Sequence, residues 1–266
     1  MSARNTVPDG QALDVRRTDA LPVRTAMRSE RGGRASNEDV ARVLHTADGG
    51  VLCLLADGLG GHGAGMLAAT IAIESIERAI RGGVVERARL VGIVATANEA
   101  ITEAQGRARG LRDMRTTLAL LHLDGVSAWW LHCGDTRVYR YRDRCLLGRT
   151  LDHSVAQMQR SSGESRDDVA ASADRHRLLR ALGGDSTSES RPRAVREALP
   201  LRSGDRFVLC TDGWWEHVEM DEAAAFDSPD PESWLASLFD AADATGARHG
   251  DDATAIAVMV GNRACP

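Results

Sequence analysis

Residues 51–62 read VLCLLADGLGGH, and this stretch decides the fold. A run of apolar residues bounded by glycines predicts a buried strand over residues 51–56. Asp57 then lies at the end of that strand, where its carboxylate can face a cleft. The closely spaced glycines let the backbone turn sharply and approach a bound ion or phosphate. Taken alone, however, an Asp-Gly pair is more often an ordinary turn.

Acidic residues recur beside other apolar runs. Asp135, Asp212 and Asp251 each adjoin such a run, as Asp57 does. If one sheet system gathers their strands, the carboxylates share one place. Bare carboxylates about 4 Å apart repel by roughly 4 kcal/mol per pair at an effective dielectric near 20, so the cluster should hold cations. An all-oxygen ligand set favours magnesium or manganese over zinc or copper.

Composition indicates one soluble, globular domain. The 266 residues suffice for one large core, and 43% hydrophobic with 27% charged residues is ordinary for a folded protein. The formal net charge of -5 gives no basic footprint for nucleic acid, so we expect no nucleic-acid partner. All 33 basic residues are arginines, which suit bidentate contacts with phosphate.

The cysteines and the apolar runs indicate the compartment. Three of the five cysteines, Cys53, Cys133 and Cys210, lie inside apolar runs, which favours a reducing environment over a disulfide framework. Residues 1–22 contain no continuous apolar segment, and no later run approaches the roughly 20 residues of a membrane span. We therefore expect a cytoplasmic monomer without a membrane span.

The order of predicted elements indicates an α+β fold. Residues 1–22 are polar and predict a flexible N-terminal arm. Helical stripes start at Met66 and at Leu90, and another helix is expected over 221–244. Antiparallel hairpins with helices beside them suggest packed sheets covered by helices. The strands are expected at 23–28, 51–56, 116–123, 127–133, 138–141, 207–211 and 255–260.

The segment 155–177 is polar, rich in Ser, Asp and Arg, and has little periodicity. A polar segment of this length inside a compact domain is usually a lid, a partner-binding flap or disordered. We therefore predict one domain over 23–262 with a flap-like insertion near 155–177.

The stretch RASNED occupies residues 34–39, just before the 51–56 strand. In isolation it favours a solvated turn with an internal ion pair. Its position beside the strand offers a second interpretation, in which Arg34 is a phosphate-binding fork and Glu38 a further acidic ligand.

Together these motifs resemble those of the metal-dependent protein serine/threonine phosphatases of type 2C, the PPM family, in their short bacterial form. The resemblance covers roughly residues 23–260, with the motifs in the family's order. The whole set of motifs is much more specific than any one motif alone. The motifs are RASNED at 34–39, DGLGGH at 57–62, GDTR at 134–137, DHS at 152–154, TDG at 211–213 and DDAT at 251–254.

The resemblance implies a four-layer α-β-β-α sandwich of two antiparallel sheets and a carboxylate site for Mn²⁺ or Mg²⁺. Asp57 would bridge two core ions. The implied partners are Glu38 and the Gly58 carbonyl on one side, and Asp212 and Asp251 on the other. Asp135 would help Asp212 to hold a third, weaker ion.

The resemblance also implies the catalytic roles of Arg34 and His62. Arg34 would bind the substrate phosphate, and His62 would be the general acid for the leaving serine or threonine oxygen. Two ions about 3.5 to 4 Å apart lower the pKa of a shared water, which then attacks phosphorus in line. No covalent nucleophile is needed.

Three positions depart from the family's pattern. Met66 stands where many relatives have an acidic residue, Arg115 replaces a glycine, and Asp252 replaces an asparagine beside a ligand. The side chain of Arg115 must point outward or clash. None of the three removes an implied metal ligand, so we expect activity.

The leading hypothesis is hydrolysis of phosphoserine and phosphothreonine in proteins, opposing a bacterial serine/threonine kinase. The tripeptide Trp214-Trp215-Glu216 is faintly similar to phosphatases encoded with type VI secretion systems. One alternative is a catalytically silent scaffold that binds phosphoproteins, which the complete acidic set disfavours. Another is a two-metal phosphodiesterase or nuclease, which the acidic net charge disfavours.

Overall fold

The computed structural model describes residues 20–61, 63–81, 83, 85–184, 192–194, 197–218, 228–244 and 250–261. The strands there are β1 (Val23–Glu30), β2 (Asp39–His45), β3 (Val51–Leu59), β4 (Arg115–Thr116), β5 (Leu118–Leu123), β6 (Ser127–Cys133), β7 (Arg137–Arg142), β8 (Cys145–Arg149), β9 (Arg193–Ala194), β10 (Leu199–Pro200), β11 (Arg206–Cys210) and β12 (Ala253–Val260). The helices are α1 (Ala64–Ile80), α2 (Arg87–Gln105), η1 (Arg109–Leu111), α3 (Val155–Ser161), α4 (Arg166–Ala171), α5 (Asp212–Trp215) and α6 (Pro231–Ala244). No helix in these ranges is long and apolar enough to cross a bilayer.

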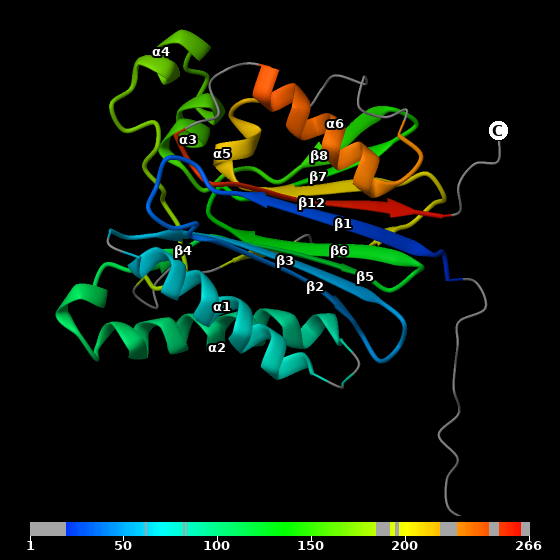
Figure 1. Cartoon of the computed structure of the whole chain (residues 1–266), viewed down its shortest axis with the longest axis horizontal. Helices are drawn as coiled ribbons and strands as arrows, with labels where there is room; N and C mark the ends of the chain where they lie inside the picture. The colour runs from blue at the N-terminus through cyan, green and yellow to red at the C-terminus, as the bar shows by residue number, and fades with distance from the viewer. Residues whose placement is uncertain are drawn as a thin grey trace, which may run out of the picture.

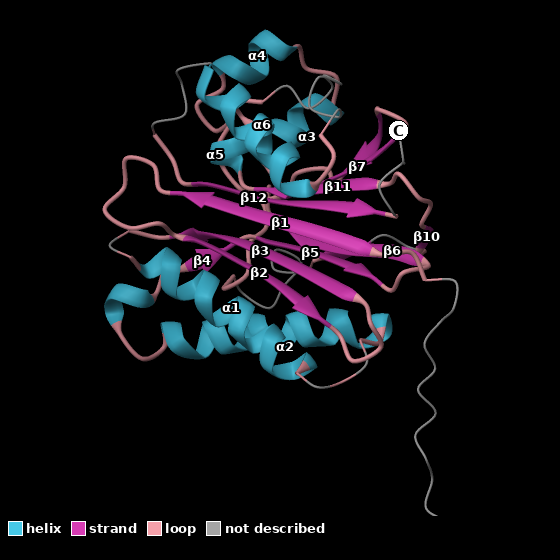
Figure 2. Ribbon diagram, turned by 45° about the vertical axis from the view of Figure 1, so that its right-hand side comes forward, coloured by secondary structure: helices cyan, strands magenta, loops and turns pink. Residues whose placement is uncertain are grey.

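The strands form two antiparallel sheets that pack face to face (Figure 1). One sheet has the order β1-β12-β11-β7-β8. The other has the order β10-β6-β5-β3-β2, with β4 beside β3 and β9 beside β6. Helices α1 and α2 cover the second sheet, and α5 and α6 lie over the first (Figure 2). This four-layer α+β sandwich confirms the predicted fold class.

Strand β3 lies inside its sheet, between β2 and β5, and both of its faces are buried. Leu52 and Leu54 pack into the cluster formed with α1 and α2, whereas Cys53 and Leu55 pack between the two sheets. This alternation explains why the strand reads as a continuous apolar run. The strand is longer than predicted, since it continues through Asp57 to Leu59 by pairing with β4.

Aromatic side chains form the core beneath α5 and α6. Trp214, Trp234 and Phe239 are fully buried there, and the ring of Trp234 meets Tyr141 edge to face at 6.2 Å. The sequence did not predict the short helix α5. The helix expected over 221–244 begins at Pro231 in the structure, and residues 221–227 lie outside the described residues.

The polar segment after β8 folds as two short helices, α3 and α4. Each begins with a serine cap: Ser154 accepts from Gln157 N, and Ser165 accepts from Asp168 N. The segment's ends meet, because Val155 N donates to Arg177 O at 2.9 Å and Leu179 N donates to His153 O at 2.7 Å.

Two glycines let β3 and α1 approach each other closely. A Cβ on Gly58 would lie 2.2 Å from the carbonyl carbon of Gly65, and one on Gly65 would lie 2.5 Å from that of Gly58. Backbone therefore contacts backbone where the strand ends and the helix begins. This contact explains why the motif after the strand is rich in glycine.

We predict that Gly58→Ala lowers the free energy of unfolding by about 2 kcal/mol, because the new methyl group overlaps backbone that cannot move aside. Gly61→Ala is the matched control, since a Cβ there meets nothing within 4 Å and its effect should stay within about 0.5 kcal/mol. Urea denaturation of the metal-free protein measures both. Equal unfolding midpoints for the two variants would contradict the close contact.

Candidate metal and catalytic site

The predicted carboxylates gather at one end of the sandwich. Asp57 lies near the end of β3, Asp135 lies between β6 and β7, and Asp212 begins α5 directly after β11. Asp251 precedes β12, which is the antiparallel neighbour of β11. The end of one strand therefore meets the beginning of the other, as the hydrogen bond from Thr211 N to Thr254 O shows.

The pKa of Asp57 shows how near these side chains are. The residue is only 6% exposed. Burial raises its pKa well above the ordinary value, and the neighbouring charges of Asp212, Asp39, Asp135 and Asp251 raise it further. The structure thus brings Asp57, Asp135, Asp212 and Asp251 together.

Asp135 and Asp212 share this environment. Burial raises the pKa of Asp135 well above its usual range, with Asp212 as the next cause. The pKa of Asp212 is raised to about 6, first by burial and then by Asp251 and Glu216. Carboxyl groups of this kind bind protons readily, and a divalent cation competes with those protons for the same oxygens.

Asp39 belongs to the same cluster, although the sequence analysis did not select it. It is paired with Asp57 across β2 and β3. Thr211 Oγ1 donates to its Oδ2 at 3.0 Å, while its Oδ1 is buried without a donor among the described residues. Burial raises its pKa to about 8, and the hydrogen bond from Thr211 opposes that rise. The register of the β2–β3 hairpin, counted outward from Gly49, could have revealed this pair.

Arg34 reaches the edge of the cluster from the loop before β2. Its Nη2 donates to the Asp251 carboxylate at 2.7 Å, and its Nη1 donates to Glu38 Oε2 at 3.3 Å. The ion pair within the turn that the sequence allowed is therefore present. The contact with Asp251, however, joins the turn to a residue 217 positions away. The Arg34 side chain is 38% exposed, so its guanidinium remains accessible to a ligand.

Asp252 fastens this loop to the start of β12. Its Oδ1 accepts from Gly32 N at 2.9 Å, and its Oδ2 accepts from Glu38 N at 2.8 Å. The two N–H groups reach different oxygens of the carboxylate, and an amide in the same place would present an NH2 donor to one of them. This geometry explains why an aspartate suits this chain where the family has asparagine. Arg115, another of the three departures from the family's pattern, has an exposed side chain and so avoids a clash.

Three predicted motifs interlock beside Asp135. Arg137 Nε and Nη2 donate to the two carboxylate oxygens of Asp152, at 2.7 and 2.5 Å. The Arg137 guanidinium lies 3.3 Å from the centre of the Trp215 ring, and Trp215 Nε1 donates to Asp135 O at 3.0 Å. These side chains position the loop that carries Asp135. No local pattern predicts their pairing, since they are distant along the chain.

A buried histidine supports the same loop from the other side. Gly134 N donates to His153 Nδ1 at 3.2 Å, and His153 N donates to Gly134 O at 2.9 Å. Burial, followed by the neighbouring His132, lowers the pKa of His153 to about 3. The two imidazoles stack with their centres 4.4 Å apart. His153 is therefore neutral and acts as a hydrogen-bond acceptor.

The donor chemistry of the cluster fits a hard divalent cation. The gathered side chains are carboxylates, and Asp39 Oδ1 is a buried acceptor that an ion or its hydration shell can satisfy. Within the described ranges no three His, Cys, Asp or Glu side chains already stand at ion-binding spacing. Glu38 now contacts Arg34, and Gly58 lies at the β3–α1 contact. His62 lies outside the described residues.

Comparison with known proteins identifies the family. Residues 28–252 match the family model described as protein phosphatase 2C. The serine/threonine protein phosphatase PstP of Mycobacterium tuberculosis is 35% identical over 198 residues, which are 73% of this chain and 36% of PstP. The chain thus spans about a third of the length of this relative.

Solved structures agree in fold and in sequence. The catalytic domain of PstP, solved in complex with two manganese ions, has a TM-score of 0.77 at 30% identity and covers 91% of this chain and 100% of that domain. PppA, a key regulatory component of the T6SS in Pseudomonas aeruginosa, has a TM-score of 0.73 at 28% identity, covering 91% and 99%. The chain belongs to the protein phosphatase 2C family.

Proposed function

We propose that this chain is a manganese- or magnesium-dependent protein phosphatase that hydrolyses phosphoserine and phosphothreonine. The observation that carries the proposal is the buried group of carboxylates around Asp57, with the Arg34 guanidinium at its edge. Family membership and the two manganese ions of the PstP catalytic domain support it.

Each carboxylate has a proposed role. Asp57 bridges two core ions, and Asp135 helps Asp212 to hold a third, weaker one. Asp39 lies beside Asp57 on the neighbouring strand, and its buried Oδ1 is a further acceptor for an ion or for a water bound to it. The remaining proposed ligands are Glu38, the Gly58 carbonyl oxygen and Asp251.

In the proposed reaction the protein orients the phosphate and supplies a proton. Two divalent ions, when bound, lower the pKa of a water and align it for in-line attack on phosphorus. Arg34 leaves its carboxylate partners and donates two hydrogen bonds to the non-bridging phosphate oxygens. As the new P–O bond forms, the bond to the serine or threonine Oγ breaks. His62 then transfers a proton to that Oγ.

The biological setting is also a proposal. We infer that the chain opposes a bacterial serine/threonine kinase, which its likeness to PstP supports, and the likeness to PppA supports a link with type VI secretion. Among the described residues Cys53, Cys145 and Cys210 are free thiols, which supports a reducing cytoplasm. We propose one catalytic domain over 23–262, with 155–177 as its flap. The scaffold alternative gains no support, because all the acidic ligands are present.

We predict that Asp57→Asn abolishes manganese-dependent hydrolysis. The rate of phosphothreonine-peptide turnover should fall by roughly 1,000-fold, because several kcal/mol of charge stabilisation are lost with the ions. Calorimetric titration should show weaker manganese binding in parallel. Asp240→Asn, an exposed position on α6, is the matched control and should behave as the wild type. Turnover that survives either a chelator or Asp57→Asn would refute the metal mechanism.

We predict that the metal-free protein loses stability as the pH rises. The folded-state pKa values of Asp212 and Asp39, about 6 and about 8, exceed their ordinary value of 3.8. The contribution of these two groups to the free energy of unfolding is therefore fully present below pH 3.8, and it is lost as the pH rises through 6 and 8. Urea denaturation in chelator should show the free energy of unfolding falling by several kcal/mol between pH 5 and pH 8.

Manganese should reverse this trend, because its ligands must be deprotonated and it therefore stabilises the protein more at pH 8 than at pH 5. Asp57→Asn removes a buried carboxyl group whose own pKa is raised well above its usual range, and it should flatten the pH dependence of the metal-free protein. An unchanged slope in that variant would show that Asp57 titrates alike in the folded and the unfolded protein.

We predict that Arg34→Gln lowers kcat/KM for a phosphothreonine peptide about 100-fold while leaving manganese affinity near the wild-type value, since charged hydrogen bonds contribute about 1.5 to 3 kcal/mol. Arg34→Lys keeps the positive charge but not the planar pair of N–H donors, so its kcat/KM should be about tenfold lower than that of the wild type. Arg31→Gln is the control in the same loop. Equal kcat/KM for Arg34→Gln and Arg31→Gln would remove Arg34 from the phosphate site.

A further inference from the structure

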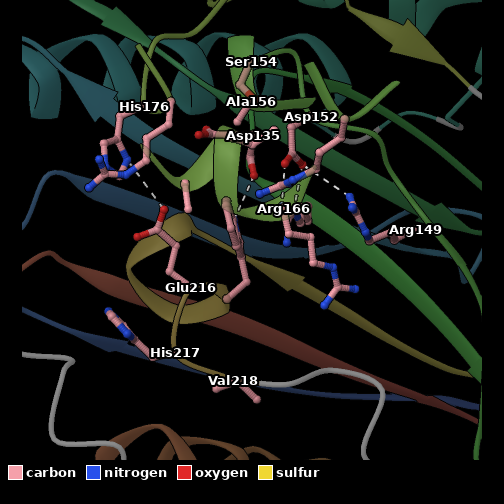
Figure 3. A pocket seen from close by; sticks show the side chains of 16 residues that line it. Asp135, Arg149, Asp152, Ser154, Ala156, Arg166, His176, Glu216, His217 and Val218 are labelled. Atoms are coloured by element: carbon pink, nitrogen blue, oxygen red, sulfur yellow. Dashed lines mark hydrogen bonds and ion pairs between the residues drawn. The ribbon is translucent and has the colours of Figure 1, made fainter. Parts of the chain in front are cut away.

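A pocket of about 920 Å³ lies beside the carboxylate cluster, between the α3–α4 segment and the turn that follows α5. Asp135 and Asp152 line it together with residues of α3 and α4. In the view of Figure 3, Asp135 lies between the pair formed by His176 and Glu216 and the pair formed by Asp152 and Arg149. The pocket is therefore continuous with the proposed site but extends away from it.

Most of the charged groups at the base of this pocket already have partners. Asp152 accepts hydrogen bonds from both Nε and Nη2 of Arg137. Arg149 Nη1 lies 3.6 Å from Asp152 Oδ1 and donates to Thr150 O. Glu216 lies 3.7 Å from His176. Asp135 faces the carboxylate cluster, where the proposed function assigns it to a metal ion.

Three further arginines line the pocket with no acidic partner within the part of the chain that the structure describes. They come from the end of α3, the start of α4 and the segment after α4. They are Arg160, Arg166 and Arg175, and all three are exposed. Positive charge is therefore in excess among the side chains that line this side of the pocket, and its complement is an anion.

Apolar groups make this pocket a better anion site than an open surface. Ala156, Val169 and Val218 contribute to its walls. Apolar walls and a concave shape reduce solvent screening and focus the field of the arginines. Guanidinium groups suit carboxylates and phosphates in particular, because their N–H groups form a planar fork.

We propose that this pocket binds a second anionic side chain of the phosphoprotein substrate, a carboxylate or another phosphate, near the phosphoresidue that is hydrolysed. The proposal rests on the proposed function, since it assigns specificity to the same site. A roughly spherical pocket of this volume is about 12 Å across, and an extended chain advances about 3.3 Å per residue. The anion therefore lies two to four residues from the target.

The test compares phosphothreonine peptides in the presence of manganese. One peptide is otherwise neutral. Others carry either a glutamate or a non-hydrolysable phosphonate analogue of phosphothreonine, two, three or four residues before or after the target. The variant Arg160→Gln/Arg166→Gln/Arg175→Gln removes the three unpaired charges. The variant Arg78→Gln/Arg81→Gln/Arg89→Gln removes the same number of charges from exposed positions of α1 and α2 and the turn after α1.

For the wild type we expect kcat/KM to be about tenfold higher for the best anionic peptide than for the neutral one, mainly through KM, with the ratio falling at high salt. The ratio of kcat/KM for the anionic peptide to that for the neutral peptide should approach one in the triple variant of the pocket arginines, here called the pocket variant. It should persist in the triple variant of α1, α2 and the turn, here called the control variant. A preference for the phosphonate would identify phosphate as the occupant, and a preference for glutamate would identify a carboxylate.

A wild-type ratio near one, or a ratio that the pocket variant retains, would overturn the pocket proposal while leaving the phosphatase intact. Failure of every peptide to be hydrolysed with manganese would instead overturn the phosphatase assignment, and the pocket proposal with it.

Discussion

The structure depends on holding several carboxylates of like charge together in a buried place. Burial raises the pKa values of Asp57, Asp135 and Asp212, nearby carboxylates raise them further, and Asp39 adds a fourth acidic group from the neighbouring strand. Such an arrangement opposes folding whenever the groups are ionised. It persists only if the surrounding structure is stable enough to hold it and if cations or protons offset its charge. The hydrogen bonds around the site stabilise the structure that holds the carboxylates together.

The surrounding contacts place each acidic loop through a partner that is distant in sequence. Asp252 joins the Arg34 loop to β12, and Arg137 joins the Asp135 loop to Asp152. Trp215 extends the second connection to α5. None of these side chains needs to touch a phosphate in order to matter, because a displaced carboxylate can no longer share an ion with its neighbours.

The sequence predicted the parts of the fold that depend on local pattern. Apolar runs located β3, β6, β11 and β12, because strands buried on both faces lack polar positions. It placed the acidic residues beside those strands, and the family resemblance assigned their roles. It missed Asp39, whose position depends on the pairing of β2 with β3. Nor could it predict α5 or the capped helices α3 and α4, since short helices are stabilised by tertiary contacts more than by periodicity.

The meeting of the two ends of the α3–α4 segment has an evolutionary consequence. Since Val155 and Arg177 are hydrogen-bonded at its base, the segment leaves the sandwich and returns at nearly the same point. Doubling the length of such an excursion adds only about 0.6 kcal/mol of closure entropy. The α3–α4 segment can therefore be replaced, lengthened or given a different charge in related enzymes without displacing the acidic residues of the cluster. Selection could then diversify the choice of target protein while the hydrolytic chemistry is inherited unchanged.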